Sequence, residues 1–372
     1  MTDILVSGAS VAGTTVAYWL ARHGYSVTVV ERHPGLRPGG QAIDVRGPAL
    51  TVLERMMLRS AADHVRTRIR GASVVDAEGN ELSGGTESTP TGGLIASLDI
   101  ELLRDDLVEL LYDATKLNVE YMFDDSIAAL EDDGSSVKVT FEHAAARRFD
   151  LVIGADGLHS NVRRLVFGPE AQFIERLGTH AAIFTVPNFL DLDYWQTWHY
   201  GDNTMVGVYS ARNNTEARAM VGFMEADLRI DYRDTEAVFA ELERRMADDG
   251  WVRPQLIEYM RSAPDFYFDE MSQIKMDRWS KGRVALVGDA GYCCSPLSGQ
   301  GTSVALLGAY ILAGELAAAG DDYALGFANY QKEFQDYVKR NQWLVIDNIP
   351  GGAPIPQEVF DRIVNSITLK GY

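Results

Sequence analysis

The order of apolar and polar positions predicts a strand–helix–strand unit at the start of the chain. Residues 3–31 hold an apolar run, the turn GASVAG, a segment with Val16, Ala17 and Leu20 on one helical face, and a second apolar run, SVTVVE. Gly24 stands where it can end the helix. This pattern is typical of a βαβ unit.

Further along, the pattern predicts a hairpin over 71–90 with its turn at AEGN, and a helix from about 100 to 114 with leucines at helical spacing. Two apolar strands, LVIG at 151–154 and VALVG at 284–288, each reach a glycine that stands near an aspartate. Parallel strands of this kind belong to an α/β sheet.

Between these two strands the pattern changes to aromatic-rich runs without helical period, at 181, 205 and 219, followed by a helix around 235–248. We therefore expect an antiparallel sheet inserted into the α/β part. The apolar stretch 304–319 is interrupted by Glu315, which favours a buried helix over a membrane span. A helix over 327–346, the breaker PGGAPIP and a last short helix complete the chain.

Composition narrows the classes of function. Lys plus Arg minus Asp plus Glu is 34 − 53 = −19, a charge that repels nucleic acid and anionic membranes, so we expect small-molecule partners and a monomer or homodimer. Cys293 and Cys294 are adjacent, which excludes a disulfide framework, a CxxC pair and a zinc site and favours the cytoplasm. The N-terminus has no basic leader, so we expect no secretory signal. The seven histidines form no HxH or HExxH metal motif.

The first turn carries a dinucleotide fingerprint. Gly8, Ser10 and Gly13 occupy its three glycine positions, and such a turn lets a pyrophosphate approach the N-terminus of the next helix. Glu31 follows Gly13 by 18 positions, where a carboxylate binds ribose hydroxyls and disfavours a 2′-phosphate. Alone, the motif does not distinguish FAD from NAD, and a glycine turn also serves plain packing.

Three motifs together resemble a known family. GASVAG with Glu31, GADGLHSNVRR at 154–164 and GDAGYCCSPLSGQG at 288–301 are similar to the fingerprints of class A flavoprotein monooxygenases, the group of p-hydroxybenzoate hydroxylase. Tyr292 stands where that family usually has histidine, and Gly308 where an acidic residue is frequent. With the two cysteines, these departures resemble the branch near tetracycline-inactivating monooxygenases.

The resemblance implies the fold class α/β (α+β overall), with a Rossmann-like FAD-binding domain, an inserted antiparallel-sheet substrate domain and a C-terminal helix. We expect the FAD-binding domain at 1–70, 98–176 and 275–322, the substrate domain at 71–97 and 177–274, and a C-terminal bridging helix region at 323–372. FAD is the implied cofactor and NAD(P)H the implied co-substrate.

The cofactor-binding residues expected from the motifs and the resemblance are Gly8, Ser10, Val11, Ala12, Gly13, Glu31, Arg32, Arg37, Gly40, Asp44, Arg104, Asp156, Gly157, Arg163, Gly288, Asp289, Pro296, Gly299, Gly301 and Thr302. The residues expected to serve catalysis are Arg37, which would guide NAD(P)H, and Gly299, Gln300 and Gly301, where a helix opens and aims N–H groups at the flavin.

Each of these assignments has a plainer alternative. Asp289 is also suited to a turn or a helix N-cap, and Asp156 to a β-turn with Arg163 and Arg164 in solvent. Arg104 can be an ordinary surface arginine. The segment RPGGQAIDVR, which holds Arg37, Asp44 and Arg46 together with Gly39 and Gly40, can be a flexible surface loop.

The implied activity is hydroxylation of a hydrophobic aromatic, phenolic or polyketide-like molecule, which includes tetracycline-like ones, through a flavin C4a-hydroperoxide. Pocket candidates are Phe184, Trp195, Trp198, Tyr200, Tyr209 and Phe223. A flavin oxidase or reductase, a halogenase and a non-catalytic flavin- or ligand-binding protein remain alternatives. YWQTWHY at 194–200 does not have the WxWxIP spacing of related halogenases.

Overall fold

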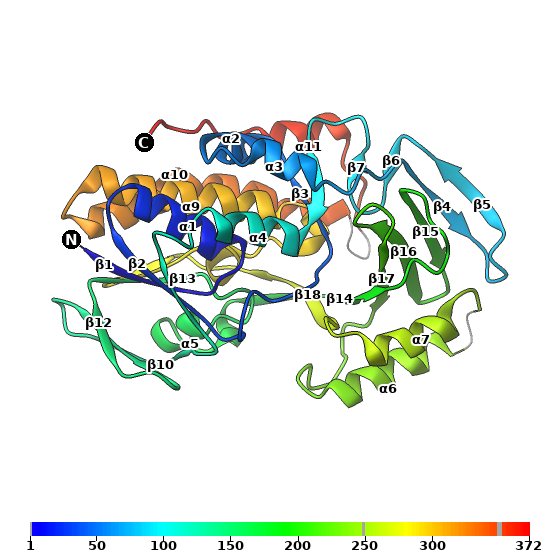
Figure 1. Cartoon of the computed structure of the whole chain (residues 1–372), viewed down its shortest axis with the longest axis horizontal. Helices are drawn as coiled ribbons and strands as arrows, with labels where there is room; N and C mark the ends of the chain where they lie inside the picture. The colour runs from blue at the N-terminus through cyan, green and yellow to red at the C-terminus, as the bar shows by residue number, and fades with distance from the viewer. Residues whose placement is uncertain (1, 248–249, 348–351) are drawn as a thin grey trace.

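The computed structural model describes residues 2–247, 250–347 and 352–372, which form two halves side by side along the long axis (Figure 1). One half is built on a six-stranded sheet of order β19-β20-β13-β1-β2-β9. Its strands are β1 (Asp3–Ser7), β2 (Ser26–Glu31), β9 (Glu120–Phe123), β13 (Leu151–Gly154), β19 (Ser280–Lys281) and β20 (Val284–Leu286), parallel except for β19.

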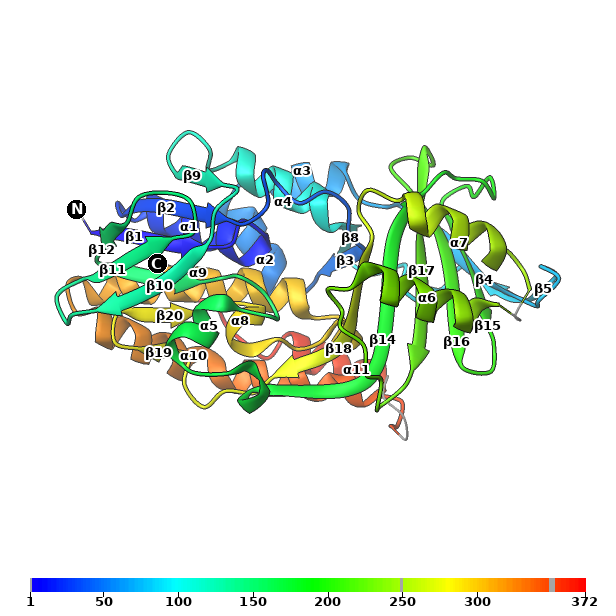
Figure 2. The ribbon, with the colours of Figure 1, turned by 90° about the horizontal axis from the view of Figure 1, so that it is seen from below.

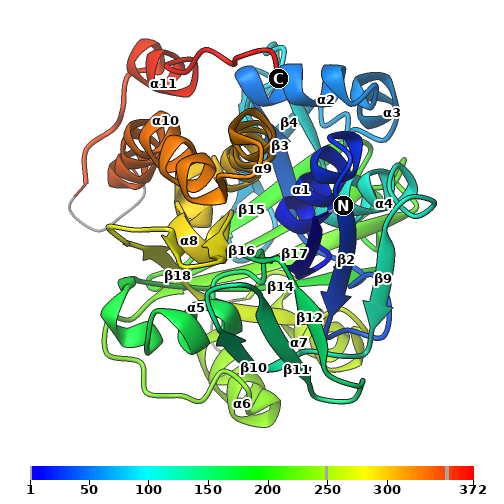
Figure 3. The same ribbon diagram turned by 90° about the vertical axis from the view of Figure 1, so that its left-hand side faces the viewer.

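Both faces of this sheet are covered, which explains why its strands are continuous apolar runs. Helices α1 (Val11–Arg22), α9 (Gly301–Ala319) and α10 (Tyr323–Trp343) cover one face (Figure 3). Ile4 and Val6 pack in the core on this face, whereas Leu5 packs in the core on the other face. That face carries α5 (Asn161–Val166) and the small sheet of β10 (Ile127–Asp132), β11 (Val137–Phe141) and β12 (Arg147–Phe149).

The other half is a seven-stranded sheet of order β18-β14-β17-β16-β15-β4-β5 (Figure 2). Its strands are β4 (Gly71–Val75), β5 (Glu81–Gly85), β14 (Ile174–Val186), β15 (Trp195–Tyr200), β16 (Thr204–Ala211), β17 (Glu216–Met224) and β18 (Tyr267–Ile274). All neighbours pair antiparallel except β15 and β4. One face packs against α6 (Thr235–Met246) and α7 (Arg253–Ser262).

The expected fold class is therefore confirmed, with one local correction. Ile100–Leu103 is not the start of a helix but strand β8, which pairs antiparallel with β3 (Ala42–Val45), and helix α4 begins at Arg104 (Arg104–Asp113). Leu102 and Leu103 are both buried by this pairing, and consecutive leucines fit a strand that is buried on both faces as well as a helix.

The remaining short elements lie between these layers or beside them. They are α2 (Pro48–Arg55), α3 (Arg59–His64), β6 (Ser88–Thr89), β7 (Gly93–Leu94), η1 (Glu170–Gln172), α8 (Asp289–Tyr292), η2 (Pro296–Ser298), η3 (Leu344–Asp347) and α11 (Gln357–Val364). Among the described residues, only α9 has the length and hydropathy of a membrane span, and 78% of that stretch is buried in the protein core.

Candidate functional site

The turn between β1 and α1 is closed too tightly for any side chain. Gly8 has a φ of +104°, and a Cβ there would lie 2.5 Å from the Ala155 carbonyl oxygen. A Cβ at Gly13 would lie 1.8 Å from the Gly8 carbonyl oxygen. Ser10 is the N-cap residue of α1, and its side chain makes no capping hydrogen bond, while Val11 and Ala12 are buried behind it. The backbone at the start of α1 is thus open to a ligand on one side only.

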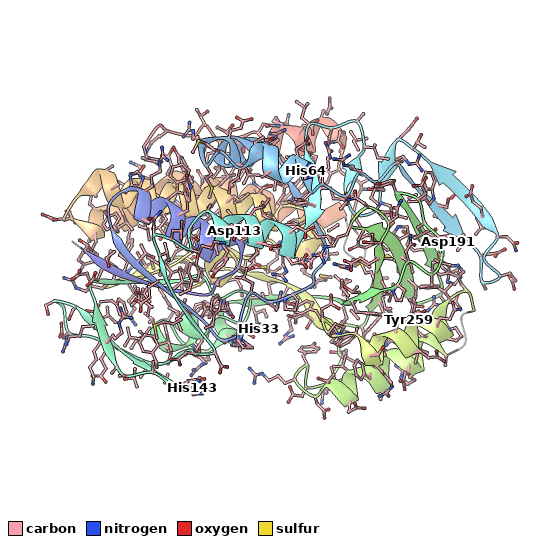
Figure 4. All side chains as sticks on the ribbon, in the orientation of Figure 1. His33, His64, Asp113, His143, Asp191 and Tyr259 are labelled. Carbon is pink, nitrogen blue, oxygen red and sulfur yellow. The ribbon has the colours of Figure 1, made fainter. Side chains whose placement is uncertain are left out.

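Glu31 is fixed at the end of β2 beside this turn. Its carboxylate oxygens accept hydrogen bonds from the Ala9 N–H at 2.8 Å and from the His33 N–H at 2.9 Å. Next to Glu31, at the end of the neighbouring strand β9, lies a surface hollow lined by Met122, Phe123, Asp124, Asp125, His143 and Ala144. Figure 4 labels His33 and His143 of this region. Arg32 is exposed.

The loop 37–42 is held between the two halves of the molecule. Arg104 is buried, and its guanidinium donates to the carbonyl oxygens of Arg37 at 3.0 Å and Gly39 at 2.5 Å. From the seven-stranded sheet, Arg218 donates to the Gly40 carbonyl oxygen at 3.2 Å, and the Tyr209 hydroxyl accepts from the Ala42 N–H at 3.0 Å. Burial and the neighbouring Arg37 lower the pKa of Arg104 to about 10.

Gly39 and Gly40 allow this close approach. Both have positive φ, and a Cβ at Gly40 would lie 2.6 Å from the Arg104 Nε. The segment is thus not a free surface loop, although the Arg37 side chain at its start is exposed and lies over the Tyr267 ring at 5.3 Å. Arg104 is likewise not a surface residue.

Asp44 on β3 and Arg46 just after it form a buried ion pair, with 2.8 Å between their charged atoms. Asp44 faces Glu101 across the β3–β8 pair, and its Oδ1 has no hydrogen-bond partner among the described residues. Burial raises the pKa of Asp44 to about 7, against the opposing effect of Arg46.

The apoprotein variant Asp44→Asn is expected to be more stable than the wild type above neutral pH. Because the folded-state pKa of Asp44 lies above its unfolded value of 3.8, the wild type loses stability as pH rises through about 7, and asparagine does not ionise. The difference in melting temperature between the variant and the wild type should be smallest near pH 4.5 and should grow toward pH 8. Each kcal/mol of unfolding free energy that the wild type loses should widen this difference by about 2–4 °C. A difference that does not change with pH would contradict the shift.

The Asp156–Gly157 motif caps α5. The Asp156 carboxylate accepts from the Val162 N–H at 2.9 Å and from the Ser160 hydroxyl, so it has a local structural role whatever else it binds. Arg163 is fully buried and donates to the carbonyl oxygens of Leu158 at 2.6 Å and Ala290 at 2.9 Å. It therefore ties this loop to the 288–292 segment and is not solvated.

Asp289 is the first residue of α8, just beyond β20, with Gly288 as the N-cap residue. Burial raises the pKa of its carboxyl. After η2, which begins at Pro296, helix α9 opens at Gly301 with Gln300 as its N-cap residue, so Thr302 lies in the first turn. The positive end of a 19-residue helix thus points out of the core here.

This helix end shows that the residues fit a polar ligand. Gln300 is 0% exposed, yet neither its Oε1 nor its Nε2 has a hydrogen-bond partner among the described residues. A Cβ built at Gly299 or Gly301 would meet no atom within 4 Å. Buried amides are normally paired, so this open space with unpaired polar atoms suits the polar edge of a flavin ring.

Replacing Gly301 by alanine tests that space. The apoprotein should keep its melting temperature within a few degrees, because the new methyl group meets no protein atom and alanine favours helix. FAD affinity should fall by about tenfold or more if the flavin edge lies there, since a methyl group then overlaps the ligand. Fluorescence titration of apoprotein with FAD measures it, and unchanged affinity would move the flavin elsewhere.

The seven-stranded sheet turns one face toward loop 37–42, and strand register sorts its residues into three rows. The inner row is Gln196, Tyr209, Arg218 and Thr185; the middle row is Trp198, Gly207, Met220, Ile183 and Tyr267; the outer row is Tyr200, Met205, Gly222, Ala181 and Asp269. Tyr209 and Arg218 of the inner row are bonded to the loop. The middle and outer rows extend away from these contacts.

The rows correct part of the expected pocket. Phe184 and Phe223 point to the opposite face and pack in the core with α6 and α7, and Trp195 packs against the same cluster. Trp198, Tyr200 and Tyr209 lie on the face toward the loop. Trp198 covers Gly207, where a Cβ would meet its ring at 2.3 Å. The alternation of side chains along each strand does not say which face of the sheet meets loop 37–42 and which meets α6 and α7.

An ionic cluster that the sequence did not predict lies between the halves. The two nitrogens of His159 lie 3.1 Å from the Glu170 carboxylate and 3.0 Å from that of Asp269 on β18. These hydrogen bonds raise the pKa of His159 to about 9. The Tyr267 hydroxyl donates to Asp269 at 2.8 Å, and its ring contacts Arg37. Within the described ranges, no group of three or more His, Cys, Asp or Glu side chains is arranged to hold a metal ion.

Comparison with known proteins places this geometry in context. Residues 1–340 match the family model described as "FAD binding domain". An uncharacterised protein of Mycobacterium tuberculosis strain H37Rv is 81% identical over 372 residues, the full length of both chains. A "Flavin-dependent monooxygenase" of Legionella longbeachae is 40% identical over 339 residues, which cover 91% of this chain and 86% of the relative. The crystal structure of the tetracycline destructase Tet(51) is 36% identical, covers 100% of both chains and superposes with a TM-score of 0.90.

Proposed function

The chain belongs to the FAD binding domain family of flavin monooxygenases, and from this premise we propose that it uses FAD, NAD(P)H and O2 to hydroxylate a hydrophobic aromatic, phenolic or polyketide-like molecule. The observation that carries the proposal is the open space at the N-terminus of α9. The side-chain amide of Gln300 has no hydrogen-bond partner there among the described residues, and a Cβ at Gly299 or Gly301 would meet no atom. The backbone of Asp44 and Arg46 is hydrogen-bonded to the first turn of α9, and the side chains of both residues also hold unpaired polar atoms.

Each part of the site has a proposed role toward FAD. The turn of Gly8, Ser10 and Gly13 receives the pyrophosphate at the positive end of α1, and Glu31 binds ribose hydroxyls. The hollow beside Glu31 receives the adenine. Asp289 accepts hydrogen bonds from the ribityl chain, and the loop with Gly40, held by Arg104, flanks the ring. Asp156, Gly157 and Arg163 support the loop against which the cofactor lies.

FAD, when bound, supplies hydride acceptance and oxygen activation. The chain contributes electrostatics and exclusion of water. The positive end of α9 stabilises negative charge on the ring edge near Gly299–Gly301, because its free N–H groups point there. The space between loop 37–42 and the facing side of the seven-stranded sheet is called the cleft. The hydrogen bonds of Tyr209 and Arg218 to the loop close one side of it.

The middle and outer rows suit a flat, hydrophobic substrate. Asp269 is the only charged residue in these two rows, and its charge is already paired with His159. Trp198 is buried over Gly207, while Tyr200 and the methionines 205 and 220 supply the apolar surface that stays accessible on this face. The 36% identity to a tetracycline destructase supports a polycyclic, phenolic or enolic molecule.

The charged end of the cleft suits the nicotinamide coenzyme. Arg37 is exposed, and its guanidinium lies over the Tyr267 ring. Burial raises the pKa of the Tyr267 phenol, and the nearby charge of Asp289 raises it further. His159, protonated at neutral pH, lies in the same cluster. We propose that NAD(P)H approaches here transiently, in the cytoplasm, and that the enzyme acts as a monomer or homodimer.

Two measurements test the proposal. Denaturing the purified protein should release noncovalent FAD, and a phenol, quinone or enol that stimulates NAD(P)H consumption should gain one oxygen atom from ¹⁸O2. Label entering from H2¹⁸O, or product formation at an undiminished rate without oxygen, would replace the monooxygenase with a dehydrogenase or hydrolase. Release of FMN alone would remove the cofactor assignment.

A further inference from the structure

Tyr292 and Gly308 fit together like a side chain and its socket. Tyr292 is the last residue of α8, the single turn that begins with Asp289, and Gly308 lies on α9. A Cβ at Gly308 would lie 2.0 Å from the Tyr292 hydroxyl oxygen and 2.9 Å from the Phe334 ring. The phenol therefore occupies the space that glycine leaves on α9, and a larger residue at 308 is incompatible with it.

The Tyr292 hydroxyl is also part of a buried hydrogen-bond chain. It lies 2.7 Å from the hydroxyl of Tyr330 on α10, and the Tyr330 hydroxyl donates to the Leu286 carbonyl oxygen at 3.2 Å. The Tyr330 hydroxyl is also the donor to Tyr292, so its one hydrogen is shared between the two acceptors. Leu286 ends β20, so the chain links the strand before Asp289 to the turn after it.

Groups outside α8 hold it in place, and the Tyr292 anchor acts beside the bond that Arg163 donates to the Ala290 carbonyl oxygen at 2.9 Å. The turn has only four residues, and the backbone on either side has positive φ, at Gly288 (+66°) and Ser295 (+71°). The Trp279 ring packs on Tyr292 with 4.5 Å between centroids, and Gln342 on α10 donates to the carbonyl oxygens of Tyr292 and Cys293. Contacts from α9 and α10 therefore help to set the orientation of α8, because a single turn is too short to hold its orientation by itself.

We propose that Tyr292 is a positioning residue that holds Asp289 toward FAD, and that Tyr292 and Gly308 act as a matched pair in place of the histidine and acidic residue expected at these positions. The inference rests on the proposed FAD site. It explains why both departures from the family pattern occur together: the glycine makes room for the tyrosine. It also places the anchor on α9, the helix whose N-terminus adjoins the same cofactor.

A double-mutant cycle tests the pairing. Gly308→Asp, Tyr292→His and the double variant are compared with the wild type by FAD titration and by melting of the apoproteins. Each single change should weaken FAD binding by about tenfold or more, and the combined loss in the double variant should be clearly smaller than the two single losses together, because removing the phenol relieves the contact at Gly308 although the Phe334 contact remains. Additive losses would overturn the matched pair.

Tyr292→Phe tests positioning without disturbing the socket. The ring stays in place, so the apoprotein should melt within a few degrees of the wild type, while FAD affinity falls several-fold and the bound-flavin absorption spectrum changes. The matched control is Tyr337→Phe on α10, which likewise loses one buried hydrogen bond, from its hydroxyl to the Val364 carbonyl oxygen at 2.9 Å. FAD binding by Tyr337→Phe should not change.

The outcomes separate this inference from the proposed function. Wild-type affinity and spectrum in Tyr292→Phe would overturn the positioning role. If the wild type itself bound no FAD, the proposed function would fail, whereas the melting temperatures of the same four apoproteins would still report whether Tyr292 and Gly308 are coupled.

Discussion

Replacing Gly13 by valine should yield a protein that purifies without FAD. A Cβ at this position would lie 1.8 Å from the Gly8 carbonyl oxygen, and Gly8 cannot retreat because its own Cα is packed against the backbone of Ala155. Helix α1 must therefore move away from β1, which displaces the N–H groups proposed to bind the pyrophosphate. Overpacking of this kind costs about 1–3 kcal/mol or more, so the affinity of apoprotein for FAD should fall by roughly 10- to 100-fold at least.

Gly24→Ala is the matched control at the other end of the same helix. Gly24 has a φ of +88°, but a Cβ there would meet no atom within 4 Å. Alanine should cost about 1–2 kcal/mol of stability through backbone strain and leave FAD affinity unchanged. If Gly13→Val folds and binds FAD like the wild type, the turn is a packing feature and the cofactor lies elsewhere.

The local motifs were predictable because their physics is local. The turn from Gly8 to Gly13 and the carboxylate of Glu31 belong to one βαβ unit, and the structure places them side by side through the Ala9 N–H. The end of β20 and the start of α9 were likewise visible as a strand followed by a glycine-rich turn. Motif spacing was sufficient for these elements, and the family match over residues 1–340 confirms the resemblance they carried.

The burial of long charged side chains could not be predicted in this way. Arg104 follows two leucines and was compatible with an exposed helix, but β8 ends there and directs the guanidinium onto the carbonyl oxygens of loop 37–42. The bond between His159 and Asp269 joins positions 110 residues apart. Such contacts depend on how two sheets meet, and a single sequence carries no local signal of that geometry.

The two faces of a strand were a further limit on what the sequence could predict about the pocket. An alternating strand such as β17 shows that Met220 and Val221 point to opposite faces but not which face meets the core. Phe184 and Phe223 were therefore counted as pocket candidates although they pack with α6 and α7. The departures at Tyr292 and Gly308 were visible separately, and only the packing of α8 against α9 shows that the Tyr292 hydroxyl fills the space beside Gly308.

Introducing a glutamate at Met220 should abolish most substrate-dependent turnover while leaving FAD bound. Met220 lies in the middle row between Gly207 and Ile183, half-buried on the face toward loop 37–42 and two residues along β17 from Arg218 of the inner row. A carboxylate there must be desolvated under a hydrophobic substrate, so kcat/KM for stimulated NAD(P)H consumption should fall by about 100-fold or more.

Met220→Leu is the control, since it conserves volume and polarity and should change kcat/KM by less than about tenfold. FAD affinity and the melting temperature of both variants should match the wild type closely, because Met220 contacts neither the glycine turn nor α9 in the proposed arrangement. A glutamate variant that keeps wild-type kcat/KM with intact FAD would show that the substrate does not lie on the middle row. The substrate would then have to approach the flavin from the side of Asp44 and Arg46, where polar contacts take the place of an apolar floor.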